Sequence, residues 1–130
     1  LSGNPVAMQA GLTQLRILKE HPEIYKQLNE KADRFYTALD AAAAKAPQGY
    51  HINHIGSLGC LYFTKNPVVD YASAKTSDTE AFAAWFRYIF EKGYYIAPSQ
   101  FEAMFLSAAH TEEELQRMTE AAGEYFAALA

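Results

Sequence analysis

The 130-residue sequence contains one cysteine, Cys60, and three classes of protein can be set aside because of what it lacks. A single cysteine excludes an internal disulfide framework and a metal site built from several cysteines, and it fits a reducing compartment. No apolar run approaches the roughly 18 residues of a membrane-spanning helix, so no membrane partner is expected. Basic residues number 11 against 15 acidic ones, and none are clustered, so a nucleic-acid partner is not expected either.

Apolar and aromatic residues, in contrast, are plentiful. They make up 50% of the chain and include nine Tyr, eight Phe and one Trp, which excludes a disordered protein. A chain of this size can bury about two-thirds of its extended surface and form one domain with a real core. The sequence begins at Leu1 without an initiator methionine, and we expect it to be a piece of a longer protein.

Four helices are predicted from apolar spacing and from end signals. Asn4 and Pro5 are typical of a helix start, and the mixed apolar spacing over 5–19 predicts a helix buried on more than one side. One apolar stripe predicts a second helix over about 22–46. Two capping boxes, 77–80 and 111–114, predict helices that end near Gly93 and at the C-terminus, with Ser77 as the first cap.

Strands are predicted between these helices, over 50–55, 58–64, 94–97 and 104–108, and residues 66–76 are predicted to be a loop. This order favours an α+β fold, in which a small antiparallel sheet of about three to four strands is covered by helices. We expect residues 1–20 to be a linking helix and residues 21–130 to be the α+β domain.

Histidine and cysteine give little sign of a catalytic or metal site. His51 and His54 would point to opposite faces of a strand, so they do not form a metal pair, and no metal site is expected. For His110, before a helix, a structural role is expected. Cys60 lies within a predicted buried strand, where a thiol is usually inert. The aromatic residues at helical spacing between Phe82 and Phe90 indicate core packing or an interface.

Two polar loops remain as candidate sites. Residues 1–5 lie at a helix N-terminus, where backbone amides can bind an anion, although an ordinary Asn-Pro cap explains them as well. Residues 98–102 place Ser99, Gln100 and Glu102 in one turn, and Glu102 is the only charged residue between Gly93 and Ala109. A lone carboxylate beside apolar strands suggests a binding site, and a plain surface loop is the alternative.

The same segments carry a family likeness that covers nearly the whole chain. The opening Leu1–Met8 and the segment Gly56-Ser57 with its following strand resemble the glutamate-1-semialdehyde 2,1-aminomutases, which are pyridoxal-phosphate enzymes grouped with class III aminotransferases. The most specific segments are Pro98–Ala103 and Leu106–Glu113. The sequence departs from the family pattern at Leu58-Gly59-Cys60, where bulkier residues are common.

The resemblance implies a fold, an activity and a cofactor. The fold would be the C-terminal small domain of a fold-type I enzyme. The full-length protein would be a cytoplasmic homodimer that converts glutamate-1-semialdehyde to 5-aminolevulinate for tetrapyrrole (porphyrin) biosynthesis. The cofactor would be pyridoxal 5'-phosphate and its pyridoxamine form, which supply the electron sink. Other class III aminotransferases and a non-catalytic α+β interaction module are the alternative interpretations.

Carried over residue by residue, the resemblance places little of the active site in this chain. Glu102, with Ser99 and Gln100 beside it, would bind the substrate, because a carboxylate can pair with a substrate ammonium. Residues Leu1, Ser2, Gly3 and Asn4 would lie near the cofactor phosphate. The Schiff-base lysine would lie upstream, so we expect no catalytic residue in this chain and no activity from it alone. Arginine, which class III aminotransferases use for the donor carboxylate, is absent from 98–108, and this mildly favours the aminomutase.

Overall fold

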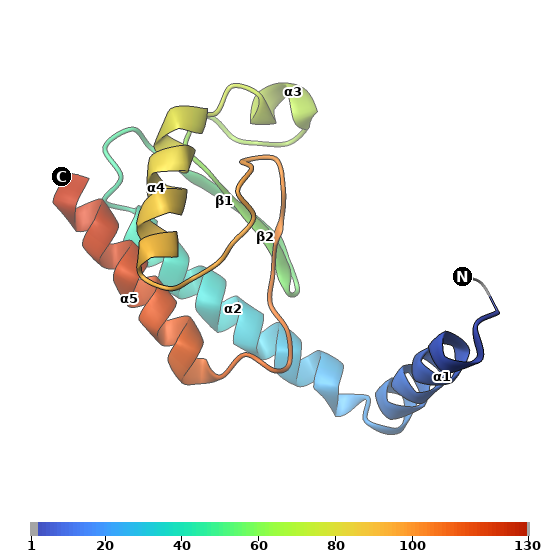
Figure 1. Ribbon diagram of the computed structural model, residues 1–130. Coiled ribbons are helices and arrows are strands. Elements are labelled where there is room, and N and C mark those ends of the chain that lie inside the picture. Colours follow the sequence, from blue (N-terminus) through green and yellow to red (C-terminus); the bar gives the residue numbers. More distant parts are fainter. Residues whose placement is uncertain (1–2, 130) are drawn as a thin grey trace.

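The computed structural model describes residues 3–129, and Figure 1 shows a body of packed helices with a small sheet and a first helix that extends away from it. Three antiparallel strands lie in the order β1-β2-β3, which confirms the predicted α+β class. The elements are α1 (Pro5–Glu20), α2 (Glu23–Ala43), β1 (His51–Ile55), β2 (Leu58–Tyr62), α3 (Tyr71–Ala74), α4 (Thr79–Glu91), β3 (Met104–Phe105) and α5 (Glu112–Leu129).

The core lies between the sheet and the helices α2, α4 and α5. Helix α5 packs along α2 and also touches α4, so the three helices cover one face of the sheet (Figure 1). The largest fully buried side chains come from all of these elements: Tyr36, Leu39, Leu61, Phe63, Trp85, Ile89 and Phe126. Burial of one such side chain contributes about 1.5–3 kcal/mol, which makes this cluster the main source of stability.

The hairpin β1–β2 forms the larger part of the sheet, with His51 opposite Tyr62 and Ile55 opposite Leu58. Its turn contains Gly56 at φ +50°, a conformation that suits glycine. Leu61 faces the core, and Gly59, on the same face, lies against the ring of Tyr36. A Cβ on Gly59 would approach Tyr36 Cζ to 2.4 Å, so the strand and helix α2 can pack this closely only because residue 59 is glycine.

The predicted strand over 94–97 is wrong. Helix α4 is closed by Gly93 at φ +94° and by the Tyr94 N–H, which donates to the Ile89 carbonyl at 3.0 Å. Residues 94–97 that follow have no regular secondary structure and no strand partner within 3–129. The strand predicted over 104–108 is shortened to Met104–Phe105, because residues 107–110 form a turn in which the His110 N–H donates to the Ser107 carbonyl.

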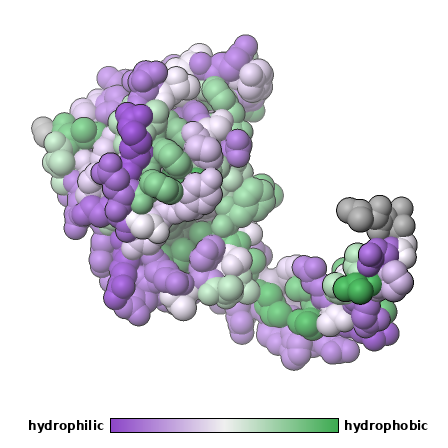
Figure 2. Space-filling view, in the orientation of Figure 1, coloured by the Kyte–Doolittle hydropathy of each residue, from purple (hydrophilic) through white to green (hydrophobic). Residues whose placement is uncertain are grey.

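Helix α1 differs from its expected environment. Every residue of α1 is exposed except Leu18, which is half-buried, so the prediction of burial on more than one side is wrong for this chain. Exposed apolar residues include Val6 (78%) and Leu15 (67%), and Figure 2 shows green apolar atoms on α1 among purple hydrophilic ones. The apolar pattern is real, but residues 21–129 provide no surface that covers it. A division at residue 20 stays a prediction.

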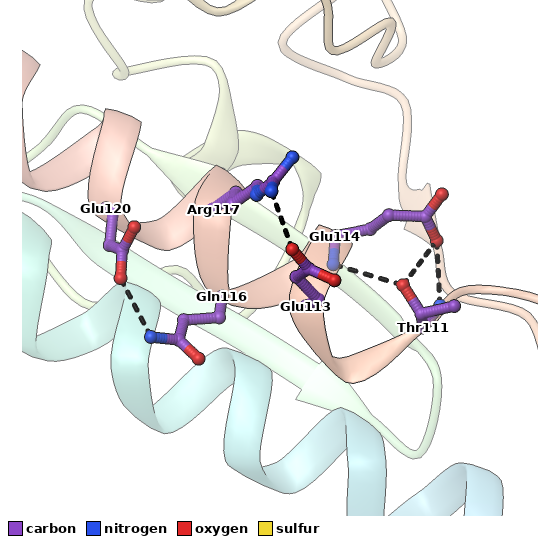
Figure 3. Close-up of polar contacts among 6 residues, drawn as sticks. All are labelled: Thr111, Glu113, Glu114, Gln116, Arg117 and Glu120. Carbon is purple, nitrogen blue, oxygen red and sulfur yellow. Dashed lines mark hydrogen bonds and ion pairs between the residues drawn. The ribbon is translucent and has the colours of Figure 1, made fainter.

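One of the two predicted capping boxes is confirmed, and the other helix is capped by a neighbouring residue. Thr111 and Glu114 form the predicted reciprocal box, in which the Thr111 N–H donates to Glu114 Oε2 at 2.8 Å and the Glu114 N–H donates to Thr111 Oγ1 at 3.2 Å (Figure 3). At α4 the cap is Asp78 and not Ser77, because Asp78 Oδ1 accepts from the N–H groups of Glu80 and Ala81. Ser77 is buried instead.

Two negative findings apply to this part of the chain. No helix in the described residues is long and apolar enough to cross a membrane. Within residues 3–129, no group of three or more His, Cys, Asp or Glu side chains is arranged to hold a metal ion. The His pair considered above is separated as expected. His54 stacks on Tyr36 with 4.7 Å between ring centroids, whereas His51 lies within hydrogen-bond distance of Asn53.

Candidate functional site

A cleft of about 600 Å³ lies between two segments of the chain, residues 93–97 and residues 102–106. Its floor is apolar and comes from Phe35 of α2 and from Leu115 and Met118 of α5. The acid–base side chains that line it are Glu102, His110 and Glu114, while neither lysine nor arginine lines it in the described chain. An apolar pocket with a few polar groups at its edge is the usual form of a small-molecule site.

Glu102 is the carboxylate that the sequence singled out, and the structure places it at the edge of this cleft. Its side chain is exposed, and among residues 3–129 it has neither a hydrogen bond nor an ion pair. Glu114, the other carboxylate that lines the cleft, caps α5, and Glu112, close to it in the sequence, pairs with Arg34 at 2.5 Å. Glu102 is therefore free to bind a cationic group of a ligand.

The turn that carries Glu102 is shaped by short-range hydrogen bonds. The Phe101 N–H donates to Ser99 Oγ at 3.2 Å, and the Glu102 N–H donates to the Ser99 carbonyl at 3.1 Å. These bonds close a compact Ser-type turn and orient the Glu102 backbone. The predicted role of Ser99 in substrate binding stays a prediction. In this structure its hydroxyl oxygen accepts a bond from its own turn.

Gln100 lies under the turn and not at the surface. It is only 4% exposed, and its Nε2 donates to the Leu61 carbonyl of β2 at 2.7 Å. Gln100 does not line the cleft that Glu102 lines. Its predicted contact with substrate is not tested by this geometry, but the side chain amide is already bonded to the sheet.

The predicted phosphate site at the start of the chain lies on a different element. Leu1 and Ser2 fall outside the described residues. Asn4 caps α1, since its Oδ1 accepts from the N–H groups of Val6 and Ala7 at 3.0 and 3.2 Å. Gly3 precedes it with a φ of +92°. Neither Gly3 nor Asn4 lines the cleft, and Figure 1 shows α1 apart from the body, so these residues and Glu102 are not brought together within this chain.

His110 is a cleft residue whose position the sequence did not indicate. Its Nδ1 accepts from the Ser107 N–H at 3.0 Å, which agrees with the expected structural role. Because Nδ1 is an acceptor, the proton of the neutral ring is on Nε2. No spacing rule connects residue 110 with Glu102, since both reach the cleft only because of the path that residues 103–109 take between them.

The tyrosine hydroxyls and the cysteine thiol near the sheet do not form a reactive site. Burial, together with the neighbouring Cys60, raises the pKa of Tyr62 to about 12, and burial also raises the pKa of Tyr36. Both phenols stay neutral at physiological pH. Cys60 is half-buried and not fully buried as predicted, because its side chain lies on the face of β2 away from the helices, where its Sγ contacts the Glu102 carbonyl at 3.5 Å.

Curated relatives match nearly all of this chain. It is 53% identical over 117 residues to glutamate-1-semialdehyde 2,1-aminomutase 1 of Lachnoclostridium phytofermentans, which covers 90% of the chain and 27% of the relative. It is 51% identical over 129 residues to glutamate-1-semialdehyde 2,1-aminomutase of Deinococcus radiodurans, covering 97% of the chain and 29% of the relative. The chain thus spans slightly more than a quarter of the length of these relatives. No family model matches the sequence.

Solved structures agree on the fold. An omega-transaminase from Sphaerobacter thermophilus superposes with a TM-score of 0.74 and 21% identity, over 98% of this chain and 28% of that one. A structure described as a transaminase with PLP bound gives a TM-score of 0.75 and 22% identity, with 97% and 28% coverage. At these identities the likeness concerns the fold alone. The sequence matches show that the chain is a homologue of one part of the glutamate-1-semialdehyde 2,1-aminomutases, about a quarter of their length.

Proposed function

We propose that this chain is the C-terminal small domain of a longer enzyme that converts glutamate-1-semialdehyde to 5-aminolevulinate, the precursor of tetrapyrroles. The observation that carries the proposal is the 53% identity to a curated aminomutase over 90% of the chain. The segment on which the resemblance depends most, 98–113, forms one side of the apolar cleft and includes Glu102.

In this proposal Glu102 binds an amino group of the substrate. Its carboxylate is unpaired among the described residues, and it lies at the edge of an apolar cleft where a charge-assisted hydrogen bond to an ammonium would be stronger than in bulk water. The apolar wall formed by residues such as Met104 excludes water from one side of the bound ligand. This chain therefore binds and orients, and no residue of it is assigned a proton-transfer step.

The cofactor is proposed for the longer protein and not for this chain alone. Pyridoxal phosphate supplies an electron sink when it is bound, and it needs a lysine for its aldehyde and donors for its phosphate. The cleft has no lysine or arginine among its described residues, and the amides at the start of α1 are taken by Asn4. The residues present do not fit the complete cofactor, so the remaining three-quarters of the enzyme must provide its site.

The resemblance also leads us to propose a homodimer that acts in the cytoplasm on a small-molecule substrate. The exposed apolar residues of α1 support an interface with protein outside residues 3–129, because an amphipathic helix is rarely stable with such residues in water. The net charge of −4 and the lack of a basic cluster support a partner other than nucleic acid.

The proposal is tested with the full-length gene product, purified with its cofactor and given glutamate-1-semialdehyde. We expect 5-aminolevulinate to form without an added amine donor, and we expect the Glu102→Gln variant to raise KM for the substrate. Arg117→Gln on α5 is the control, since Arg117 pairs with Glu113 and does not line the cleft. A strict requirement for an external amine donor would indicate another class III aminotransferase. No cofactor binding at all would indicate an interaction module.

A further inference from the structure

We propose that Gln100 is a positioning residue, which fixes the carboxylate of Glu102 at the cleft by attaching the turn 98–102 to an unpaired stretch of β2. This inference rests on the proposed function of Glu102. It assigns to Gln100 a role that differs from the contact with substrate expected from the sequence.

The first observation is where β2 loses its strand partner. On one side β2 pairs with β1 along its whole length, but on the other it pairs with β3 only at Leu58 and Gly59. Beyond Gly59, no strand among residues 3–129 covers this side of β2. The backbone groups that point that way need other partners, because buried carbonyls are costly to leave unpaired.

The second observation is that the Gln100 side chain takes part of the place of the missing strand, while other contacts hold the residues that follow it. Gln100 Nε2 donates to the Leu61 carbonyl at 2.7 Å in a buried position. Next to it, the Cys60 Sγ contacts the Glu102 carbonyl at 3.5 Å, and the ring of Phe101 packs edge-on against Tyr71 with 6.1 Å between centroids. Three consecutive residues of the turn are thus each held, while the exposed Glu102 carboxylate has no partner among residues 3–129.

The third observation concerns the other end of the Gln100 amide. Its Oε1 is buried and has no hydrogen-bond partner within the described chain. A buried acceptor without a partner offsets much of the stability gained from the Nε2 bond. The amide is thus a poor stabiliser overall, but a short directional bond from a 4% exposed side chain is well suited to fix where the turn lies.

The consequence is a specific form of coupling. If Gln100 acts only through Glu102, its removal lowers kcat/KM when the Glu102 carboxylate is present and leaves kcat/KM unchanged when the carboxylate is absent. If Gln100 has a general structural role, its removal lowers the activity of either background by the same factor. A double-mutant cycle separates these two cases, because it measures the interaction between the two residues.

The experiment uses the full-length enzyme with its cofactor and four proteins: the wild type, Gln100→Leu, Glu102→Gln and the double variant. We expect Gln100→Leu to lower kcat/KM by about tenfold to a hundredfold, the range that a misplacement of about 1 Å causes, and to have less than about a twofold effect in the Glu102→Gln background. Gln116→Leu is the matched control, because the Gln116 side chain donates to exposed Glu120 of α5 and does not line the cleft, and this variant should keep full activity (Figure 3).

Each outcome is decisive for one of the two proposals. Equal losses from Gln100→Leu in both backgrounds, or no loss in either, would overturn the positioning role. A Glu102→Gln variant with wild-type kinetics would overturn the proposed role of Glu102 in substrate binding, whereas a requirement for an external amine donor would overturn the proposed aminomutase function. If Gln100→Leu does not fold, Gln100→Asn replaces it. This shorter amide keeps the polarity but cannot reach the Leu61 carbonyl, and it must show the same dependence on Glu102.

Discussion

Replacing Gly59 with alanine should destabilise the protein, because there is no room for a methyl group between β2 and α2. A Cβ at residue 59 would lie 2.4 Å from Cζ, 2.5 Å from Cε1 and 2.7 Å from the hydroxyl oxygen of Tyr36. The Tyr36 ring would have to move by about 1 Å to restore an ordinary contact. It is 1% exposed, stacked on His54 and in edge-on contact with Phe35, so it has no free space to move into.

The expected loss is about 1–3 kcal/mol in the free energy of unfolding, the usual cost of overpacking a core. Gly123→Ala in α5 is the matched control. There the new Cβ would meet Ala42 Cβ at 4.0 Å, an ordinary contact, so this same substitution should stabilise the helix by about 0.5–1 kcal/mol. The two alanine substitutions are thus predicted to have opposite signs.

Urea denaturation followed by tryptophan fluorescence suits this comparison, because Trp85 is the only tryptophan and is 0% exposed in the folded chain. A further variant, Tyr36→Ala, should interact with Gly59→Ala. Once the ring is absent, the added methyl group has room, so the double variant should lose less than the sum of the single losses. A Gly59→Ala protein as stable as the wild type would refute the close packing of β2 on Tyr36.

Three further predictions follow from the cap of α5, the exposed helix α1 and the cleft. The pKa of Glu114 lies below its ordinary value of 4.5, because its carboxylate accepts hydrogen bonds from the Thr111 backbone and side chain. Its contribution to stability is therefore complete above the unfolded pKa and is lost as the pH falls through the lowered folded pKa. Glu114→Gln should flatten this part of the acid unfolding curve, and an unchanged curve would contradict the cap. This chain alone should self-associate through α1 in a sedimentation series, and Leu15→Glu should reduce the association; a monomer at all concentrations with no binding of a hydrophobic dye would argue against an unsatisfied apolar surface. The chain alone should also give no stoichiometric visible absorbance when pyridoxal phosphate is added, and a one-to-one band would show that it contains a complete cofactor site.

Local signals in the sequence predicted the elements whose formation depends on local interactions. The apolar stripe of α2 and the box formed by Thr111 and Glu114 led to the right helices, and the apolar run after Gly56 led to the right strand. The cap of α4 was placed one residue early, since Ser77 and Asp78 both can cap and only the backbone geometry decides between them. The prediction of a loop over 66–76 is wrong for the short helix α3, whose capping box is formed by Asp70 and Ser73.

The errors beyond these depend on what each segment meets in three dimensions. Residues 94–97 have the composition of a strand, but a strand forms only beside a partner strand. On the open side of β2, the Leu61 carbonyl accepts from the Gln100 side chain and not from another strand. The apolar pattern of α1 indicates a buried helix, yet residues 21–129 do not cover it. Periodicity reports which residues favour burial, and it cannot report which molecule buries them.

The candidate site was predictable in part. Glu102 stands out as a lone charge, and the resemblance assigned it a role that the cleft accommodates. The burial of Gln100 had no signal in the sequence, because an amide in a polar turn looks the same whether it faces a ligand or the Leu61 carbonyl. The contribution of His110 to the cleft was also missed, since it depends on how the turn 107–110 folds back.

The central claim is that this chain supplies one substrate-binding carboxylate to a pocket completed by the rest of a longer enzyme. The most direct measurement is a crystal structure of the full-length protein with its cofactor and a bound substrate analogue that carries an amino group. The account predicts a Glu102 carboxylate oxygen about 2.7–2.9 Å from that amino nitrogen, with Gln100 Nε2 still bonded to the Leu61 carbonyl. A Glu102 side chain that points into bulk solvent, away from the bound analogue, would contradict it.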